Sequence, residues 1–227
     1  MSNFTTWRSL VDGEDIFAIP DSEVSYRIDE GSGSTLADSG AGGHELDFSL
    51  RNGETWEDNS DFFEGTAPVF DGTDDDAILD QAETIDLGDE GTLAIAFRYD
   101  SFKDAMVFHE SNADPDRFYI RTRDDELEVG LAGSNVGFSD AIPTTGFYGV
   151  VLRWNSGSFD VDVNNGEETG SGSYSGTVDT TTEDWTLASQ SGSDRFFEGA
   201  IDGPLQLNNS EWSDEEKSDW FDVLPWL

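Results

Sequence analysis

Short stretches in which apolar residues alternate with polar or small ones recur along the chain and restrict it to β structure. In "TLAIAFRY" (92–99), Leu93, Ile95, Phe97 and Tyr99 face one way and two alanines face the other. "GVVLRWNSGSFDVDVNNG" (149–166) reads as a hairpin that turns at 155–158. Further strands are expected at 24–29, 45–50, 67–71, 76–80, 105–109, 117–122, 126–131, 184–188 and 196–207.

About a dozen short strands separated by Gly, Asn and Asp turns predict an all-β fold, a two-sheet antiparallel jelly-roll sandwich. A short C-terminal helix is expected to begin at Ser213, because Ser213 and Glu216 have the spacing of a capping box. Residues 1–22 are predicted to be an N-terminal arm, which either packs on the sandwich edge or serves attachment or oligomerisation. Residues 23–227 are predicted to form the domain. Its apolar end "WFDVLPWL" (220–227) either packs on the sandwich, which we favour, or serves attachment or oligomerisation.

The acidity of the chain limits the conditions in which it can fold. It has 50 acidic and 11 basic residues, a formal net charge of -39. Self-repulsion of this size destabilises a compact domain, and molar salt relieves it by shortening the screening length to about 3 Å. With 16 Phe, 7 Trp and 5 Tyr the chain is too aromatic to be disordered. We therefore expect a protein of a salt-loving, haloarchaeal organism or one of its viruses, and no binding to nucleic acid, which requires Lys and Arg.

Targeting signals are not visible in the sequence. The start "MSNFTTWRSLVDGED" has no basic region followed by an apolar run, so no secretion signal is expected. No stretch is long and apolar enough for a membrane helix, so no membrane insertion is expected. We interpret this pattern as that of a virion protein made in the host cytoplasm.

Several motifs follow one another in the order seen in a known family. "SYRIDEGSGSTLADSGAGGHELDFSLRNGETW" (25–56) and "PVFDGTDDDAIL" (68–79) resemble the opening of LamG-like, concanavalin A-like jelly-roll domains. "GTLAIAFRY" (91–99), "GFYGVVLRW" (146–154) and "FFEGAIDGPLQLNNSEWSDEE" (196–216) resemble their later strands and closing helix. Trp212 stands where the family usually has leucine. The resemblance covers about residues 24–222 and implies a domain that binds carbohydrate or protein, often with one structural Ca²⁺.

Calcium is the cofactor that the resemblance implies, and it points to particular aspartates. Asp202, in the last Gly-x-Ile-Asp strand, matches the family position that often binds the ion, and Asp71 and Asp38 are weaker matches. Either of these two residues can instead cap a turn. From the residues alone, the acidic loop 69–80 is either a calcium loop or a solvated loop. Asp74, Asp75 and Asp76 reach one ion only if the loop bends, because successive strand residues point to opposite faces.

Arginines and aromatic residues are the candidates for contacts with a ligand. Arg121 and Arg123, with Arg117, share one strand face and are able to bind an anionic sugar or sulfate, or to pair with neighbouring acids. Trp56 and Tyr174 lie in polar stretches and are candidates for stacking on a sugar, although Trp56 is at a family position that usually packs.

Catalysis is not expected. A glycosidase needs two carboxylates across a cleft, and Glu126 with Glu128 lacks the third carboxylate of the jelly-roll glucanase pattern. His44 and His109 have no nucleophile motif beside them. The sequence therefore predicts a non-enzymatic module of a virus particle that recognises a host surface glycan or glycoprotein. It would contact other virion proteins and form a homo-oligomer. A purely structural capsid or tail protein, or a cellular lectin-like domain, are the alternatives.

The charge leads to a prediction about stability. In EDTA-treated samples, the thermal unfolding midpoint should rise by about 10 °C or more between 0.1 M and 3 M KCl, because salt screens the carboxylate repulsion. Differential scanning calorimetry measures this midpoint directly. A midpoint that stays constant or falls over this range would contradict the assignment to a high-salt environment.

Overall fold

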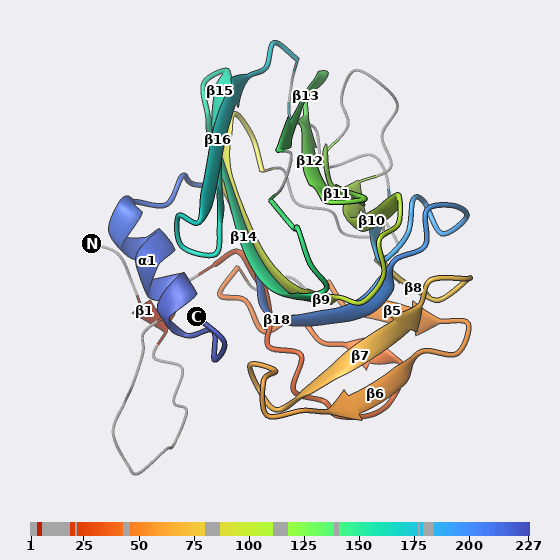
Figure 1. The fold of residues 1–227 in the computed structure, drawn as a ribbon. Coiled ribbons are helices and arrows are strands. Elements are labelled where there is room, and N and C mark those ends of the chain that lie inside the picture. Colours follow the sequence, from red (N-terminus) through yellow and green to blue (C-terminus); the bar gives the residue numbers. More distant parts are fainter. Residues whose placement is uncertain are drawn as a thin grey trace.

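Two antiparallel β-sheets stack face to face in the computed structural model, which describes residues 4–5, 19–20, 22–42, 46–79, 87–110, 118–138, 141–176, 178 and 184–227 (Figure 1). The first, called the β10 sheet, has the order β13 (Ser134–Phe138), β12 (Glu126–Leu131), β11 (Phe118–Arg123), β10 (Ala105–Glu110), β17 (Trp185–Leu187), β8 (Asp76–Leu79), β5 (Phe48–Arg51) and β4 (Thr35–Leu36). The second, called the β9 sheet, has the order β16 (Glu168–Ser173), β15 (Ser158–Val163), β14 (Gly146–Asn155), β9 (Glu90–Tyr99), β18 (Glu198–Asn208), β7 (Thr66–Asp71) and β6 (Thr55–Asp58), and β3 (Val24–Tyr26) also pairs with β18. The predicted jelly-roll sandwich is confirmed.

The core lies between the sheets and follows the alternation seen in the sequence. On β9, Leu93, Ile95 and Phe97 are buried in the main cluster, as predicted. β14 pairs with β9 so that Val150 lies opposite Ile95 and Leu152 opposite Leu93. The two central strands therefore bring their apolar faces into register against the β10 sheet.

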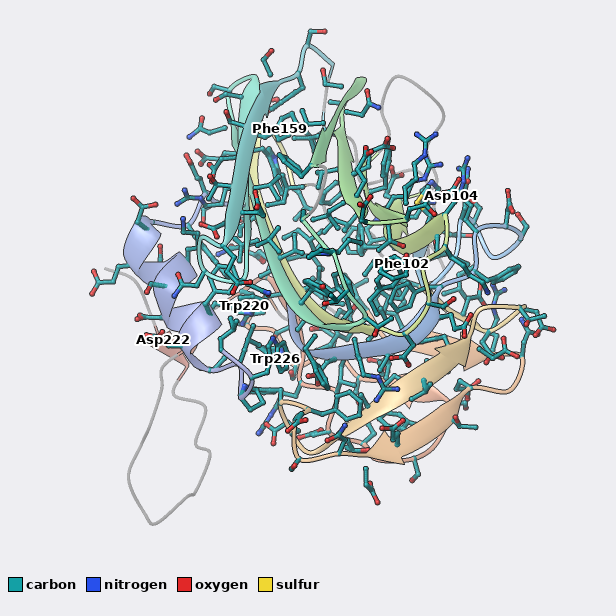
Figure 2. The ribbon with its side chains drawn as sticks, in the orientation of Figure 1. Phe102, Asp104, Phe159, Trp220, Asp222 and Trp226 are labelled. Atoms are coloured by element: carbon teal, nitrogen blue, oxygen red, sulfur yellow. The ribbon has the colours of Figure 1, made fainter. Side chains whose placement is uncertain are left out.

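Small residues on the other face of the β9 sheet make room for the C-terminal helix. Ala94, Ala96 and Val151 form a second buried cluster with Trp212, Trp220, Phe221 and Leu224. At Gly149, an added Cβ would lie 2.6 Å from the Leu224 side chain. Figure 2 places Trp220 between the helix and the sheet. The C-terminal end therefore covers this face of the sheet, in agreement with the packing alternative.

The helix α1 (Asp214–Asp222) begins as the sequence indicates. Ser213 is its N-cap, its hydroxyl accepts the Glu216 N–H, and the Glu216 carboxylate accepts the Ser213 N–H. Within the described ranges, no helix is long and apolar enough to cross a membrane. β1 (Phe4–Thr5) and β2 (Ile19–Pro20) pair with each other, and β2 lies beside α1. Ser22 is buried and its carbonyl accepts the Ala41 N–H at 2.9 Å, and the other residues of the predicted arm fall outside the described residues.

Four edge strands were not predicted: β4, β6, β13 and β16. β6, β13 and β16 are polar or glycine-rich. β16 lies inside "NNGEETGSGSYSG" (164–176), whose polar, glycine-rich sequence predicts a loop. Gly170 and Gly172 of β16 leave space for the rings of Phe138 and Phe159, since a Cβ at either glycine would collide with them. The polar composition reflects two glycines that pack closely rather than a solvated loop, so that interpretation was wrong.

Asp202 is an interior residue of β18 that anchors a loop. It is fully buried, and its carboxylate accepts the N–H of Gly203 at 2.8 Å and the N–H of Phe63 at 3.0 Å. The Phe63 bond holds the 59–65 connection between β6 and β7 against the sheet. Burial raises the pKa of Asp202 to about 8, although the two N–H groups favour its charged form.

This pKa predicts how Asp202 affects stability. Because the folded pKa lies above the ordinary value of 3.8, the native state holds a proton that the unfolded state releases. The stability contribution is therefore complete at low pH and is lost as pH rises through about 8. As pH rises from about 3.8 to about 8, the Asp202→Asn variant should gain stability relative to wild type by up to about 1.4 kcal/mol per pH unit.

Chemical denaturation at pH 5, 6.5 and 8 measures this difference. Asp61→Asn is the matched control, because it removes a carboxylate from an exposed position of the same connection. A difference between Asp202→Asn and wild type that does not change with pH would contradict the prediction.

Candidate functional site

The acidic stretch after β7 bends, and three of its aspartates meet. Oxygen atoms of Asp71, Asp74 and Asp75 lie within 4.8 Å of one another. Gly72 has a φ of +73°, which allows the bend. Asp71 accepts the N–H of Thr73 at 2.7 Å, and Asp75 accepts the N–H of Asp71 at 3.1 Å. The sequence left open whether the aspartates of this loop converge, and three of them do.

The other two aspartates of the stretch do not join this cluster. Asp76 is fully buried on β8, where Arg51 binds it at 2.5 Å and the Ser189 hydroxyl donates to it at 2.9 Å. Asp80 lies outside the described residues. Asp75 is nearly buried, and desolvation raises its pKa first, with further contributions from the charges of Asp71, Asp74 and Glu54. A cation would relieve the repulsion in this cluster.

The 100–104 connection between β9 and β10 lies directly beside the acidic loop. The Lys103 ammonium donates to the Gly72 carbonyl at 2.8 Å and pairs with Glu198 at 3.1 Å. The Thr122 hydroxyl donates toward the Lys103 carbonyl at 3.3 Å, which links this connection to β11. Residues 71–75, 100–104 and 123–125 therefore border one end of the sandwich, which we call the Phe102 rim.

The Tyr99 hydroxyl is the centre of the hydrogen bonding in this rim. It accepts the Lys103 N–H at 2.7 Å and lies 3.2 Å from the carbonyls of Lys103 and Asp124. Its ring is buried in the core and stacks with Phe197, with the centroids 6.0 Å apart. One anchored side chain thus joins two turns that are distant in sequence and holds them in place.

Phe102 projects from this anchored turn. Its ring meets the Tyr99 ring edge-on at 5.6 Å, yet 47% of the residue is exposed. Among the described large hydrophobic residues, only Phe102 and Leu227, at the end of the chain, are exposed to this degree. Figure 2 shows Phe102 and Asp104 at the same end of the molecule. An exposed ring on a rigid support offers apolar contact to a ligand at low entropic cost.

The two predicted arginines of β11 have different environments. Arg121 grips Asp104 with two bonds of 2.6 Å and also donates to Glu128 at 3.1 Å. Glu128 accepts the Tyr119 hydroxyl at 2.9 Å as well. The hydrogen bonds from Arg121 are the main reason that the pKa of Asp104 is lowered. Arg121 is therefore engaged within the fold, as in the ion-pairing alternative, whereas Arg123 is exposed.

The predicted calcium residues are not brought together. Asp202 is buried under the 59–65 connection, and Asp71 is in the rim. Asp38 caps a turn, where its carboxylate accepts the N–H of Ser25 at 3.0 Å and of Gly40 at 2.8 Å. These three aspartates do not form a common ligand set, and Asp74 and Asp75 are the partners of Asp71 instead.

The predicted aromatic contacts belong to the packing of the fold. Tyr174 is 8% exposed, lies in the main core and donates its hydroxyl to the Asp89 carbonyl at 3.0 Å. Its prediction as a stacking residue was wrong, because its glycine and serine neighbours hid a buried position. Trp56 is partly buried on β6 and donates to the Gly33 carbonyl at 2.9 Å. It packs on the core, as its place in the family pattern implied.

The remaining candidates do not form a catalytic group among the described residues. His109 is buried on β10, and His44 and Arg117 fall outside the described residues. Glu126 lies over Gly137, since a Cβ there would be 2.0 Å from its carboxylate oxygen. Glu126 and Glu128 are thus engaged with neighbouring strands rather than facing each other across a cleft.

A hollow lies beside the rim, at the start of β14, where Gly146 pairs with Tyr99. It has a volume of about 340 Å³ and is lined by residues that include Thr144, Phe147, Asn164, Glu167 and Glu168. Its polar groups are largely engaged in hydrogen bonds. The Asn164 side-chain oxygen accepts the Gly149 N–H, and its NH₂ group donates to the Glu167 carboxylate, each at 2.9 Å. The Phe147 ring is stacked on Trp226 with the centroids 4.9 Å apart. The rim offers a freer aromatic face and is the stronger candidate.

Sequence reasoning missed Phe102, Lys103 and Asp104. Their signal is present in "DSFKDAM" (100–106), where a phenylalanine stands among polar residues outside the alternation of the flanking strands. Such a residue is either a loop anchor or an exposed contact, and the fold is needed to decide between them.

Comparisons with solved structures identify the same fold. Domain 4 of AbnA, an extracellular arabinanase of Geobacillus stearothermophilus solved in complex with arabinotriose, is 17% identical, with a TM-score of 0.65 over 90% of this chain and 98% of that one. The botulinum neurotoxin serotype D binding domain is 12% identical, with a TM-score of 0.65 over 89% of this chain and 50% of that one. The binding domain of Paraclostridial Mosquitocidal Protein 1 is 11% identical, with a TM-score of 0.65 over 88% and 52%.

At these identities the similarity shows the fold alone, and the chain spans about half the length of the toxin binding domains. No match to a curated protein was found. A family model, by contrast, matches residues 71–214, which is more than half of the chain and includes the rim. The chain therefore belongs to the concanavalin A-like lectin/glucanases superfamily, through its Laminin_G_3 family.

Proposed function

We propose that the protein is a non-catalytic carbohydrate-binding domain whose ligand contacts the Phe102 rim. The observation that carries this proposal is an exposed phenylalanine, 47% accessible, held on a turn that the Tyr99 hydroxyl anchors. Polar groups of Asp104, Arg123 and Asp124 border the same turn and suit the hydroxyl groups of a sugar. Membership of a lectin and glucanase superfamily supports this class of ligand, as does the arabinotriose bound to the similar arabinanase domain.

A glycanase is the competing function within the same superfamily. The described carboxylates do not support it, because Glu128 is bound by Arg121 and Tyr119 and Glu126 lies over Gly137. A reducing-sugar assay in high salt separates the two functions. Release of reducing ends by wild type, with loss in Glu128→Gln, would overturn the non-catalytic proposal.

The finer proposal is that the domain belongs to the particle of a salt-adapted virus and recognises a host surface glycan or glycoprotein. Its support is the net charge of -39, together with the fold shared with receptor-binding domains of toxins. Contacts with other virion proteins and self-association belong to this proposal. Copurification with infectious particles tests it. Absence from purified particles would leave a cellular lectin-like domain, whereas particle association without glycan binding would indicate an assembly role.

Calcium fits the Asp71, Asp74 and Asp75 cluster better than Asp202. The cluster offers three converging carboxylates, one of them nearly buried with a raised pKa. The Asp202 carboxylate is already bonded by two backbone N–H groups in the interior. Calcium takes six to eight oxygens, so carbonyls and water would complete the shell. We propose that the calcium ion implied by the family resemblance binds at this cluster.

Calcium should therefore stabilise the domain through this loop. At about 100 times its Kd, a bound ion adds ~2.7 kcal/mol to the free energy of unfolding. In high salt, we expect Ca²⁺ to raise the unfolding midpoint of wild type and of Asp202→Asn. Ca²⁺ should not change the midpoint of Asp75→Asn. Mg²⁺ at equal concentration is the ionic control. A shift that persists in Asp75→Asn and disappears in Asp202→Asn would move the ion back to Asp202.

Phe102 should matter for binding and little for stability. In about 2–3 M salt, labelled Phe102→Ala should bind intact salt-loving cells roughly tenfold more weakly than wild type, a loss of about 1.4 kcal/mol of ring contact. Released surface glycan should compete with the wild-type binding. Leu227→Ala is the matched control, since Leu227 is equally exposed at 51% but lies at the chain end. Equal binding by Phe102→Ala and wild type would remove the rim from the proposal.

A further inference from the structure

Arg123 is the starting point, because it forms no ion pair with a described acid in a very acidic protein. Every other described lysine and arginine forms an ion pair with an aspartate or glutamate. Arg123 is exposed on β11 and makes no such pair with any described residue. With 50 acidic residues and 11 basic ones in the chain, an unpaired arginine is not explained by a shortage of carboxylates.

The carboxylates nearest to Arg123 are already held by other groups. Glu126 lies opposite Arg123 in the β11–β12 ladder, but its carboxylate is directed over Gly137 on β13. Asp104, whose pKa Arg123 helps to lower, is gripped at both oxygens by Arg121 and lies 3.5 Å from Arg195. Arg121 thus neutralises Asp104, and no carboxylate of the described residues accepts a hydrogen bond from Arg123.

The turn that follows Arg123 adjoins the turn that carries the exposed aromatic ring. Asp124, the next residue, offers its carbonyl to the Tyr99 hydroxyl, which also binds the Lys103 N–H next to Phe102. Asp124 has a φ of +56°, so the turn after Arg123 is tight. Two adjoining turns, both hydrogen-bonded to the Tyr99 hydroxyl, therefore carry an exposed aromatic ring and an exposed arginine.

We propose that the Phe102 rim binds an acidic glycan, with a sugar carboxylate on the Arg123 guanidinium and a sugar ring against Phe102. A guanidinium matches a planar carboxylate with two parallel hydrogen bonds, which an ammonium or a neutral donor does not reproduce. This inference rests on the proposed function and adds the class of ligand, a carboxylate-bearing sugar such as a hexuronate.

The net charge of the protein does not prevent this binding in salt. The charge of -39 repels an anionic ligand at long range in dilute buffer. In molar salt the screening length is about 3 Å, so distant carboxylates no longer act while a direct contact still does. An acidic glycan should therefore bind more tightly as KCl rises from about 0.2 M to 2 M, the opposite of ordinary ion pairing. The same sugar without its carboxylates should show a much weaker salt response.

The test compares native and carboxyl-reduced forms of the same oligosaccharides. Oligomers of galacturonate, alginate and hyaluronate are titrated calorimetrically against wild type in about 2 M KCl, each also as the form in which the carboxylates are reduced to alcohols. We expect at least one native form to bind roughly tenfold or more tighter than its reduced form. Arg123→Gln should abolish that preference, and Arg123→Lys should restore only part of it.

Two controls separate this inference from the proposed function. Arg27→Gln removes the same charge from an arginine that pairs with Glu64 away from the rim, and should bind as wild type does. Thermal unfolding establishes that each variant is folded. Equal affinity for native and reduced forms, lost in Phe102→Ala but unchanged in Arg123→Gln, would overturn the acidic ligand and keep the glycan-binding rim. No binding of any form by wild type would overturn both.

Discussion

The burial of β9 on both of its faces is the constraint on which the rest of the structure depends. One face carries Leu93, Ile95 and Phe97 into the space between the sheets, and the other carries Ala94 and Ala96 beneath α1. A strand with large residues on both faces would not accept the helix so closely, and one with small residues on both would leave the sandwich unfilled. The alternation of large and small side chains therefore fixes both the core and the position of the C-terminal segment.

The same strand ends at the candidate site. Tyr99, its last residue, continues the apolar face into the core and turns its hydroxyl toward the 100–104 and 124–125 connections. A phenylalanine there would pack equally well but would leave the Lys103 N–H without this acceptor. The rim is thus a consequence of the core, since the group that orders its turns is a core side chain. This arrangement explains how Phe102 is held while remaining exposed.

Sequence reasoning located the strands that bury an apolar face and missed those that do not. β9, β14, β15 and β18 alternate or carry long apolar runs, so their positions followed from periodicity. β13 and β16 pack through glycine and a few aromatic contacts at the sandwich edge, which leaves no periodic signal. Tyr174 was misplaced for the same reason, because its serine and glycine neighbours resemble a loop although its ring is in the core.

The candidate site was only partly accessible because it is assembled from distant parts of the chain. The sequence singled out Asp71, Arg121 and Arg123 individually. Residues 71–75, 100–104 and 123–125 are linked by hydrogen bonds of Lys103 and Tyr99, and neither contact has a local pattern. Whether an arginine forms an ion pair also depends on tertiary geometry. Arg121 and Arg123 are two residues apart on one strand, yet of these two only Arg121 donates hydrogen bonds to Asp104.

The small number of lysines and arginines makes the environment of each one informative. In a chain with few lysines and arginines, most described cations stabilise acids that the fold needs, such as Arg51 with Asp76 and Lys217 with Asp162. A buried or half-buried carboxylate without such a partner is costly, so the pairing of these acids reflects the stability of the fold. Arg123 forms no ion pair with an acid among the described residues. Its exposure beside an anchored aromatic ring is therefore better explained by what the rim binds than by what holds the domain together.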